Sequence, residues 1–107
     1  MKSLKIAFVI LTLGSVSLFA SNGEDLVKQN GCMDCHNVVG KKAAPAFRGI
    51  ARRNTKWHGS AAQENIENSV KNGSSGKYLQ FKGSEMPAYG HLSDAELKAM
   101  SEWILSL

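Results

Sequence analysis

The sequence has few cysteines, prolines and aromatic residues, and this scarcity excludes several kinds of protein. Its 107 residues include 2 Cys, 2 Pro and 7% aromatic residues. Two cysteines cannot build the multi-disulfide framework of a small secreted scaffold. Without a second cysteine pair there is also no regular set of four ligands for a structural zinc ion. The length fits one domain, and neither an internal repeat nor a second domain is visible.

A long apolar run is also missing. The run Ile6–Leu13 is much shorter than the roughly 20 residues needed to span a bilayer. Lys2 and Lys5 precede this run and small residues follow it, which is typical of a secretory signal peptide. We therefore expect residues 1–20 to be a cleaved leader and residues 21–107 to form the domain, with an uncleaved anchor as the alternative.

The charge of the mature chain is nearly balanced. Two of the 13 Lys and Arg residues lie in the expected leader, which leaves 11 against 9 Asp and Glu, a formal charge of +2. This argues against a nucleic-acid-binding protein. Acidic residues are absent from Asn37–Gln63. That stretch carries Lys41, Lys42, Arg48, Arg52, Arg53 and Lys56. It is either ordinary solvated surface or a basic rim that steers the protein to an acidic partner.

The C-terminal segment has the clearest helical pattern. Ser93 and Glu96 form a capping-box signature, and Leu92 and Leu97 are placed as a hydrophobic staple. An apolar stripe follows at helical spacing, formed by Leu97, Met100, Trp103, Ile104 and Leu107. This pattern predicts a terminal helix with one buried face.

The remaining segments predict further helices and no strands. We expect helices at Asn22–Asn30 and Ala61–Lys71, the second ending at Asn72-Gly73. Asn37–Lys56 shows no sustained period and predicts a loop with a short helix at Phe47–Arg53. No segment alternates with period two, so the expected fold class is all-α.

Both cysteines lie in Cys32-Met33-Asp34-Cys35-His36, which matches the Cys-x-x-Cys-His pattern of c-type haem attachment. On one helical turn, residues three apart share a face, so both thiols can reach one haem, and His36 can point its imidazole at the iron. A thioredoxin-like site, a zinc site and a plain disulfide are the alternatives. The first lacks a βαβ context, the second lacks ligands, and the third closes too short a loop to stabilise much.

The other side of the iron has several candidate ligands. They are Met33, Met86, Met100, His58 and His91. Met86 is favoured because it precedes Pro87 in a loop with no periodic reason to hold a thioether, whereas Met100 falls on the apolar stripe. His91 is the substitute. A vacant position would instead indicate a haem enzyme or gas sensor.

Several further segments carry a family resemblance. Cys32–His36, Pro45-Ala46-Phe47, Lys71–Gly76 and Met86-Pro87 occur in that order before a Trp-bearing terminal helix. The series resembles the small monohaem bacterial class I cytochromes c. The resemblance implies an all-α fold of about three to five helices around one covalent haem, with the first and last helices crossing.

The resemblance also implies the site and the function. It implies covalent haem c on Cys32 and Cys35, with His36 and Met86 as axial iron ligands. The Pro45 carbonyl would accept the second ring N–H of His36. Independently of the resemblance, the position of Trp57 in a polar loop suggests that it lies in the haem environment, where it, Arg52, Arg53 or His58 would meet the propionates.

Such a protein is a periplasmic one-electron carrier and not an enzyme. The expected partners are redox proteins, such as a terminal oxidase, peroxidase or reductase and an upstream quinol-oxidising complex. Neither nucleic acid nor a small-molecule substrate is expected, and the protein should be a monomer. The alternative in the binding-module class is a haem subunit of a larger respiratory complex.

Overall fold

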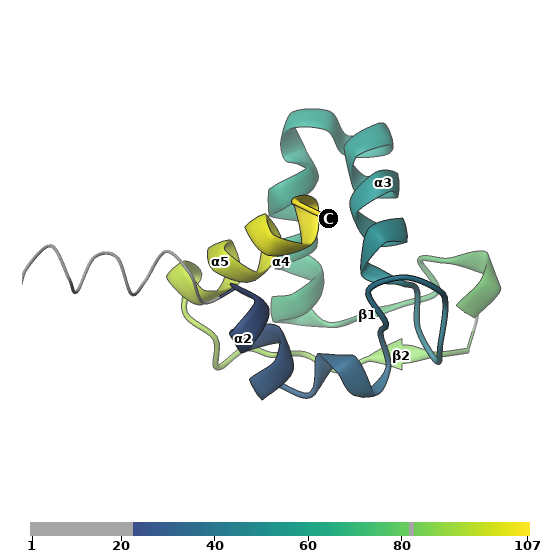
Figure 1. Ribbon diagram of the computed structural model, residues 1–107, viewed down its shortest axis with the longest axis horizontal. Coiled ribbons are helices and arrows are strands. Elements are labelled where there is room, and N and C mark those ends of the chain that lie inside the picture. Colours follow the sequence, from purple (N-terminus) through teal and green to yellow (C-terminus); the bar gives the residue numbers. More distant parts are fainter. Residues whose placement is uncertain (1–22, 82) are drawn as a thin grey trace, which may run out of the picture.

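The computed structural model describes residues 23–81 and 83–107 (Figure 1). The expected leader, residues 1–20, lies outside the described residues. The elements in chain order are α2 (Gly23–Gln29), the 3-10 helix η1 (Cys32–Asp34), α3 (Phe47–His58), the 3-10 helix η2 (Gly59–Ala61), α4 (Ala62–Asn72), β1 (Ser74–Ser75), the 3-10 helix η3 (Leu79–Phe81), β2 (Glu85–Met86) and α5 (Asp94–Leu105). Among these residues, none of the helices has the length and apolar character needed to cross a membrane.

The C-terminal helix α5 is the centre of the fold. The predicted capping box is confirmed, because the Glu96 backbone N–H donates to Ser93 Oγ at 3.1 Å and the Ser93 N–H donates to Glu96 Oε1 at 2.9 Å. Leu97, Met100 and Ile104 are buried as the stripe predicts. Through this face α5 contacts α2, α3 and α4, so the core forms around one helix.

The first and last helices pack at very close range. A Cβ added to Gly23 would collide with the carbonyl oxygen of Ala99 and would lie 2.8 Å from Trp103 Cβ. Glycine therefore allows α2 to approach the backbone of α5. The predicted pairing of the terminal helices is confirmed, and α2 ends at Gln29, one residue before the predicted Asn30.

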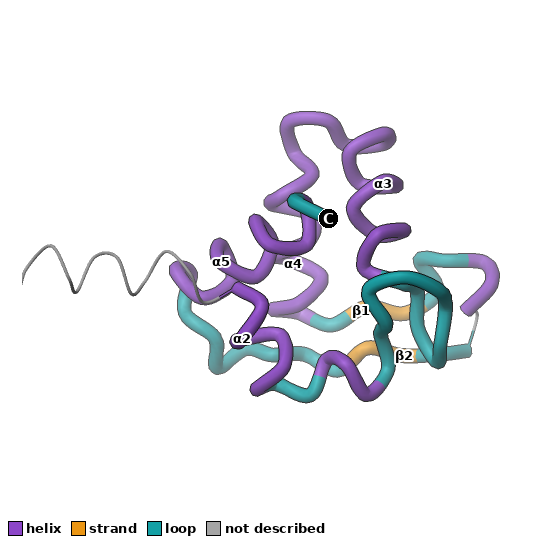
Figure 2. The backbone as a smooth tube through the Cα atoms, in the orientation of Figure 1, coloured by secondary structure: helices purple, strands orange, loops and turns teal. Residues whose placement is uncertain are grey.

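Helices α3 and α4 run side by side in opposite directions and are joined by η2 (Figures 1 and 2). The expected helix at Phe47–Arg53 is longer than predicted and ends at His58. Its buried positions are Phe47, Ala51 and Asn54. Because two of these three are a small residue and a polar one, the apolar period that normally reveals a helix is weak.

The loops gather at the side of the molecule opposite the turn that joins α3 to α4 (Figure 2). There β1 and β2 form a two-stranded antiparallel ladder in which Ser74 pairs with Met86. The prediction that the chain has no strands was therefore wrong for these two short segments. Two residues per strand are too few for a period-two pattern to be visible. Helical structure still dominates, as expected.

Candidate functional site

The two cysteines lie on a single turn. Gly31, with φ of 72°, precedes η1, and the backbone N–H groups of Cys35 and His36 both donate to the Cys32 carbonyl, at 3.2 and 2.9 Å. Cys32 is buried and Cys35 is exposed, and both are free thiols. The turn therefore presents two unlinked thiols and an imidazole from five consecutive residues.

The His36 ring is fixed by two contacts. Its Nδ1 lies 2.6 Å from the Pro45 carbonyl oxygen. Because a carbonyl only accepts, Nδ1 must carry the proton and donate it, which leaves the lone pair on Nε2. The Phe47 ring stacks on the imidazole with centroids 4.8 Å apart, and Trp103 meets Phe47 edge-on at 5.6 Å. The interaction predicted for Pro45 is present.

Burial controls the protonation of this turn. It lowers the pKa of His36, and the hydrogen bond to the Pro45 carbonyl opposes this shift only in part. Burial also raises the pKa of the Cys32 thiol, with smaller contributions from Asp34 and Cys35. At neutral pH the imidazole is consequently uncharged, which is the form that can bind a metal through Nε2.

A cavity of about 340 Å³ lies between the cysteine turn, α3, α4 and the β1–β2 loops. Cys32, Cys35, His36, Pro45 and Met86 all line it. Much of the remaining lining is apolar, including Phe47, Ile50, Ile66, Val70, Phe81 and Ile104. Five of the six sequence-predicted site residues, from three separate segments of the chain, thus meet around one cavity.

The other candidate ligands lie elsewhere. Among the Met and His residues that the structure describes, only His36 and Met86 line this cavity. Met100 is 1% exposed and packs in the core. His91 Nε2 lies 3.3 Å from Asn30 Oδ1 on the surface, and His58 is exposed at the end of α3.

Met86 owes its position to the segment that follows α4. At Gly73, which has φ of 77°, the chain leaves α4 and passes close to the Met86 segment. A Cβ added to Gly73 would lie 2.6 Å from the Met86 carbonyl oxygen. The ladder pairs Ser74 with Met86, and the Tyr89 N–H donates to the Val70 carbonyl at 2.9 Å. The Met86 segment is therefore held at Met86 by β1 and at Tyr89 by the last turn of α4.

One end of the cavity is polar, and sequence reasoning missed it. Five lining residues form this polar cluster: Asn54, Asn65, Ser69, Lys77 and Tyr78. Asn65 Nδ2 donates to Asn54 Oδ1, and Lys77 Nζ donates to Ser69 Oγ. Burial raises the pKa of Tyr78, against the lowering effect of nearby Arg53 and Asn54. The sequence signal that could have revealed this cluster is Asn54, a polar residue on the same helix face as the apolar residue Phe47.

The structure does not bring Trp57 to the cavity. Its side chain is 71% exposed and does not contribute to the lining. Of the cations suggested with it, Arg53 comes nearest, since it donates to the Lys77 carbonyl at 2.8 Å and lies 4.1 Å from the Tyr78 ring centroid. Arg53 therefore adjoins the polar cluster, whereas Trp57 does not line the cavity.

The donor set suits a covalently attached haem. Two free thiols on one turn, a neutral imidazole beside them and a thioether face a largely apolar cavity with one polar end. Within residues 23–81 and 83–107, no group of three or more His, Cys, Asp or Glu side chains is arranged to hold a metal ion directly. A zinc site therefore has no support in this part of the chain.

Comparison with known proteins gives a consistent result. The family model for cytochrome c matches residues 20–107. The chain is 36% identical to cytochrome c-552 of Nitrosomonas europaea over 92 residues, covering 86% of this chain and 84% of that protein. It is 32% identical to cytochrome c-552 of Hydrogenobacter thermophilus, covering 97% and 99%. The crystal structure of wild-type Nitrosomonas europaea cytochrome c552 superimposes with a TM-score of 0.66 at 37% identity, covering 78% of this chain and 98% of that one.

The helices and the cavity define a small haem protein with the class I cytochrome c fold. The chain belongs to the cytochrome c family. As a member it binds covalent haem c with its iron and is an electron-transfer protein, not an enzyme. Its partners are accordingly redox proteins.

Proposed function

We propose that His36 and Met86 are the two axial ligands of the haem iron, and that the chain carries single electrons between redox partners. The observation that supports this ligand pair is that no other described Met or His lines the cavity. When bound, the haem supplies a one-electron couple at its iron. Two strong protein ligands leave no position open, which suits electron transfer and not oxygen chemistry.

The surrounding residues have distinct roles in this proposal. Cys32 and Cys35 would hold the haem through thioether bonds. The Pro45 carbonyl keeps the His36 imidazole in one tautomer and orientation, which tunes the ligand. Phe47 restrains the same ring by stacking. The polar cluster would face the haem carboxylates, for which its amide, ammonium and hydroxyl donors are suited.

A matched pair of variants tests the ligand assignment. A thioether–iron bond gives ferric haem a weak near-infrared absorption band, which bis-histidine and five-coordinate haem lack. Met86→Leu should abolish that band in the purified holoprotein. Met33→Leu should keep it, because Met33 packs against the core and does not line the cavity.

If both variants keep the band, the assignment of Met86 is wrong. If the wild type lacks the band and His91→Gln changes the haem spectrum, His91 is the ligand instead. A spectrum of five-coordinate haem in the wild type would favour the alternative of a haem enzyme or sensor.

We also propose where the protein works. Residues 1–20 would be removed as a signal peptide during export, and residues 21–107 would act in the periplasm as a monomer. The partners would be a quinol-oxidising complex upstream and a terminal oxidase, peroxidase or reductase downstream. The mass of the exported holoprotein tests the cleavage after Ala20. Co-purification with a complex in mild detergent would instead favour a permanent haem subunit.

A further inference from the structure

Helix α3 has two faces of different composition. Phe47, Ile50 and Asn54 line the haem cavity. Arg48, Arg52 and Lys56 follow one another at four-residue intervals, so they form one row on a different face of the same helix. At a rise of 1.5 Å per residue, successive cations in this row lie about 6 Å apart along the helix. The row is therefore separate from the residues that hold the haem.

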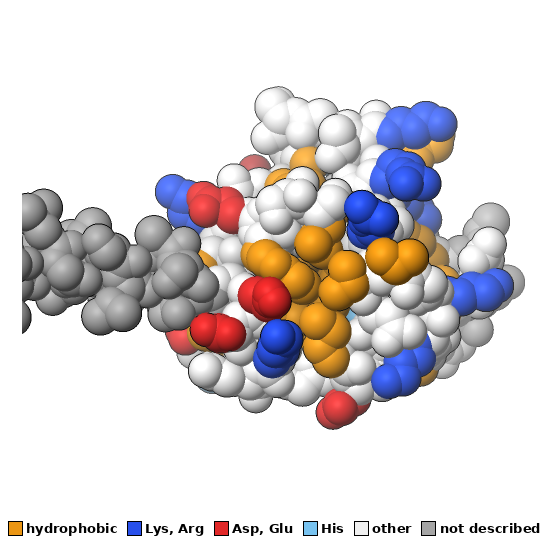
Figure 3. All heavy atoms as spheres, in the orientation of Figure 1, with side chains coloured by type: hydrophobic (Ala, Val, Ile, Leu, Met, Phe, Trp, Pro, Cys, Tyr) orange, Lys and Arg blue, Asp and Glu red, His pale blue; other side chains and the backbone are white. Residues whose placement is uncertain are grey.

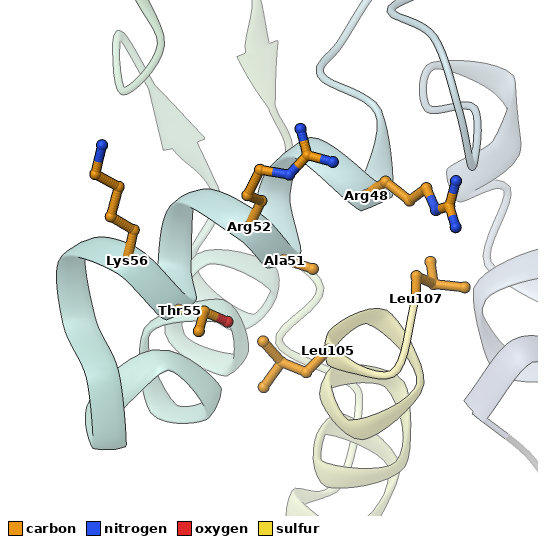
Figure 4. Close-up of a pocket in the computed structure, with 7 residues that line it drawn as sticks. All are labelled: Arg48, Ala51, Arg52, Thr55, Lys56, Leu105 and Leu107. Carbon is orange, nitrogen blue, oxygen red and sulfur yellow. The ribbon is translucent and has the colours of Figure 1, made fainter.

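The cationic row borders a groove of about 530 Å³ between α3 and the end of α5. Figure 4 shows Ala51 of α3 facing Leu105 and Leu107, with Arg48 extending beside Leu107 and the charged ends of Arg52 and Lys56 directed away from the leucines. Ala51 is buried, and both leucines pack partly against the core. The groove thus has an apolar floor and one basic wall.

The basic wall is not neutralised within the described part of the chain. The ion pairs formed there are Lys28–Glu24 and Lys98–Glu102, which do not involve Arg48, Arg52 or Lys56. Figure 3 shows Lys and Arg side chains gathered along the α3 edge beside an apolar patch, with Asp and Glu mostly on the other side. The groove therefore combines unpaired positive charge with apolar surface.

We propose that this groove binds an acidic amphipathic helix of a protein partner. Carboxylates four residues apart on a helix match the spacing of the cationic row. An apolar side chain from the same helix would fill the space over Ala51, Leu105 and Leu107, as in other helix-in-groove recognition. A flat lipid surface would meet the protruding cations but could not fill the recessed floor.

This inference goes beyond the axial ligation and uses a different face of the molecule. It rests on the proposed function in one respect, namely that the partner belongs to the electron-transfer chain. Peptide binding is measured without transferring an electron. A protein with another sixth ligand would still bind the peptide, so failure of one proposal is distinguishable from failure of the other.

The test uses the holoprotein and a synthetic amphipathic peptide with glutamates four residues apart and leucines on the adjoining face. We expect the peptide to shift amide resonances of Arg48–Lys56 and Leu105–Leu107. In Arg48→Gln/Arg52→Gln the affinity should fall about fivefold to tenfold at low salt. Raising the salt concentration should weaken binding to the wild type, since exposed charges are screened.

Two matched controls isolate the groove from general charge. Lys41→Gln/Lys42→Gln removes the same charge from the same acid-free stretch and should change affinity less than about twofold. A peptide with glutamine in place of glutamate, and another with serine in place of leucine, should both bind more weakly. Equal loss in both protein variants, shifts confined to other residues, or binding to anionic vesicles but not to the peptide would each overturn the proposal.

Discussion

The helical and loop parts of the molecule are stabilised in different ways. The helical frame, defined as α2, α3, α4 and α5, buries apolar side chains around α5. The loop side, defined as residues 37–46, 73–81 and 83–91, packs only partly buried side chains such as Val38, Met86 and Tyr89 against that core. It also has backbone hydrogen bonds to the frame and the cysteine turn, such as those from Ala44 to Cys35 and from Tyr89 to Val70. The haem cavity lies between them. The difference indicates that the frame supplies most of the fully buried apolar contacts among the described residues.

The largest effect should come from breaking the frame. Gly23→Ala places a Cβ against the Ala99 carbonyl and should lower the free energy of unfolding by about 3 kcal/mol. Gly49→Ala is the matched control, because nothing lies within 4 Å of its added Cβ, and it should raise stability by about 0.5 kcal/mol through helix propensity. Denaturant unfolding of both holoproteins measures the difference. Similar stabilities would show that the close helix contact is not needed.

A smaller effect should come from the loop side. Gly73→Ala combines a positive φ with the approach to the Met86 carbonyl and should cost about 2 kcal/mol. It should also weaken the near-infrared band, because the Met86 segment must move. Gly76→Ala, with φ of 68° and open space, should cost about 1 kcal/mol and leave the band unchanged. Equal bands in the two variants would contradict the role of Gly73.

The boundary between the two parts can be tested at Asn54. This residue is 4% exposed and accepts a hydrogen bond from Asn65. Asn54→Ala leaves the Asn65 amide without its partner and should cost about 1.5 kcal/mol. The control is the exposed Asn68→Ala on α4, which should stay within about 0.5 kcal/mol of the wild type. Thermal unfolding measures the stability of both variants. Equal effects would show that the hydrogen bond between Asn54 and Asn65 does not stabilise the fold.

The smallest effect concerns pH and the start of α5. Hydrogen bonds with Ser93 lower the pKa of Glu96 below its ordinary value of 4.5. A carboxylate whose pKa is lower in the folded state stabilises above the unfolded pKa, and this contribution is lost as pH falls through the folded pKa. Glu96→Gln keeps an acceptor but cannot titrate, so below pH 4.5 its stability should fall less steeply than that of the wild type. Parallel curves would contradict this role.

The same division explains what the sequence could predict. The terminal helix was predictable because Ser93, Glu96 and the apolar stripe are local signals. Cys32, Cys35 and His36 were predictable because they are adjacent in the chain. Met86 was favoured by its position before Pro87 in a segment without helical period, and the family resemblance agreed with this choice. Pro45 needed the resemblance, since only the folded chain brings it to the cavity.

Other features could not be predicted from local patterns. The length of α3 was not predicted because its buried face includes Ala51 and Asn54. Hydropathy does not distinguish such small or polar buried residues from exposed ones. The polar cluster forms from side chains of three separate segments, so no spacing in the sequence reveals it. Trp57 was placed near the haem on its position in a polar loop, and the helix that extends through this residue leaves it exposed.

The close contact between Gly23 and Ala99 also has a consequence for folding. It joins residues near the two ends of the described chain, so forming it closes a long loop, at an entropic cost on the order of 4 kcal/mol. The contacts of His36 with Pro45 and of Ser74 with Met86 close much shorter loops. We therefore expect both walls of the cavity to form first and the terminal helices to join last. Gly23→Ala should then accelerate unfolding and leave the folding rate nearly unchanged, which stopped-flow measurements would show.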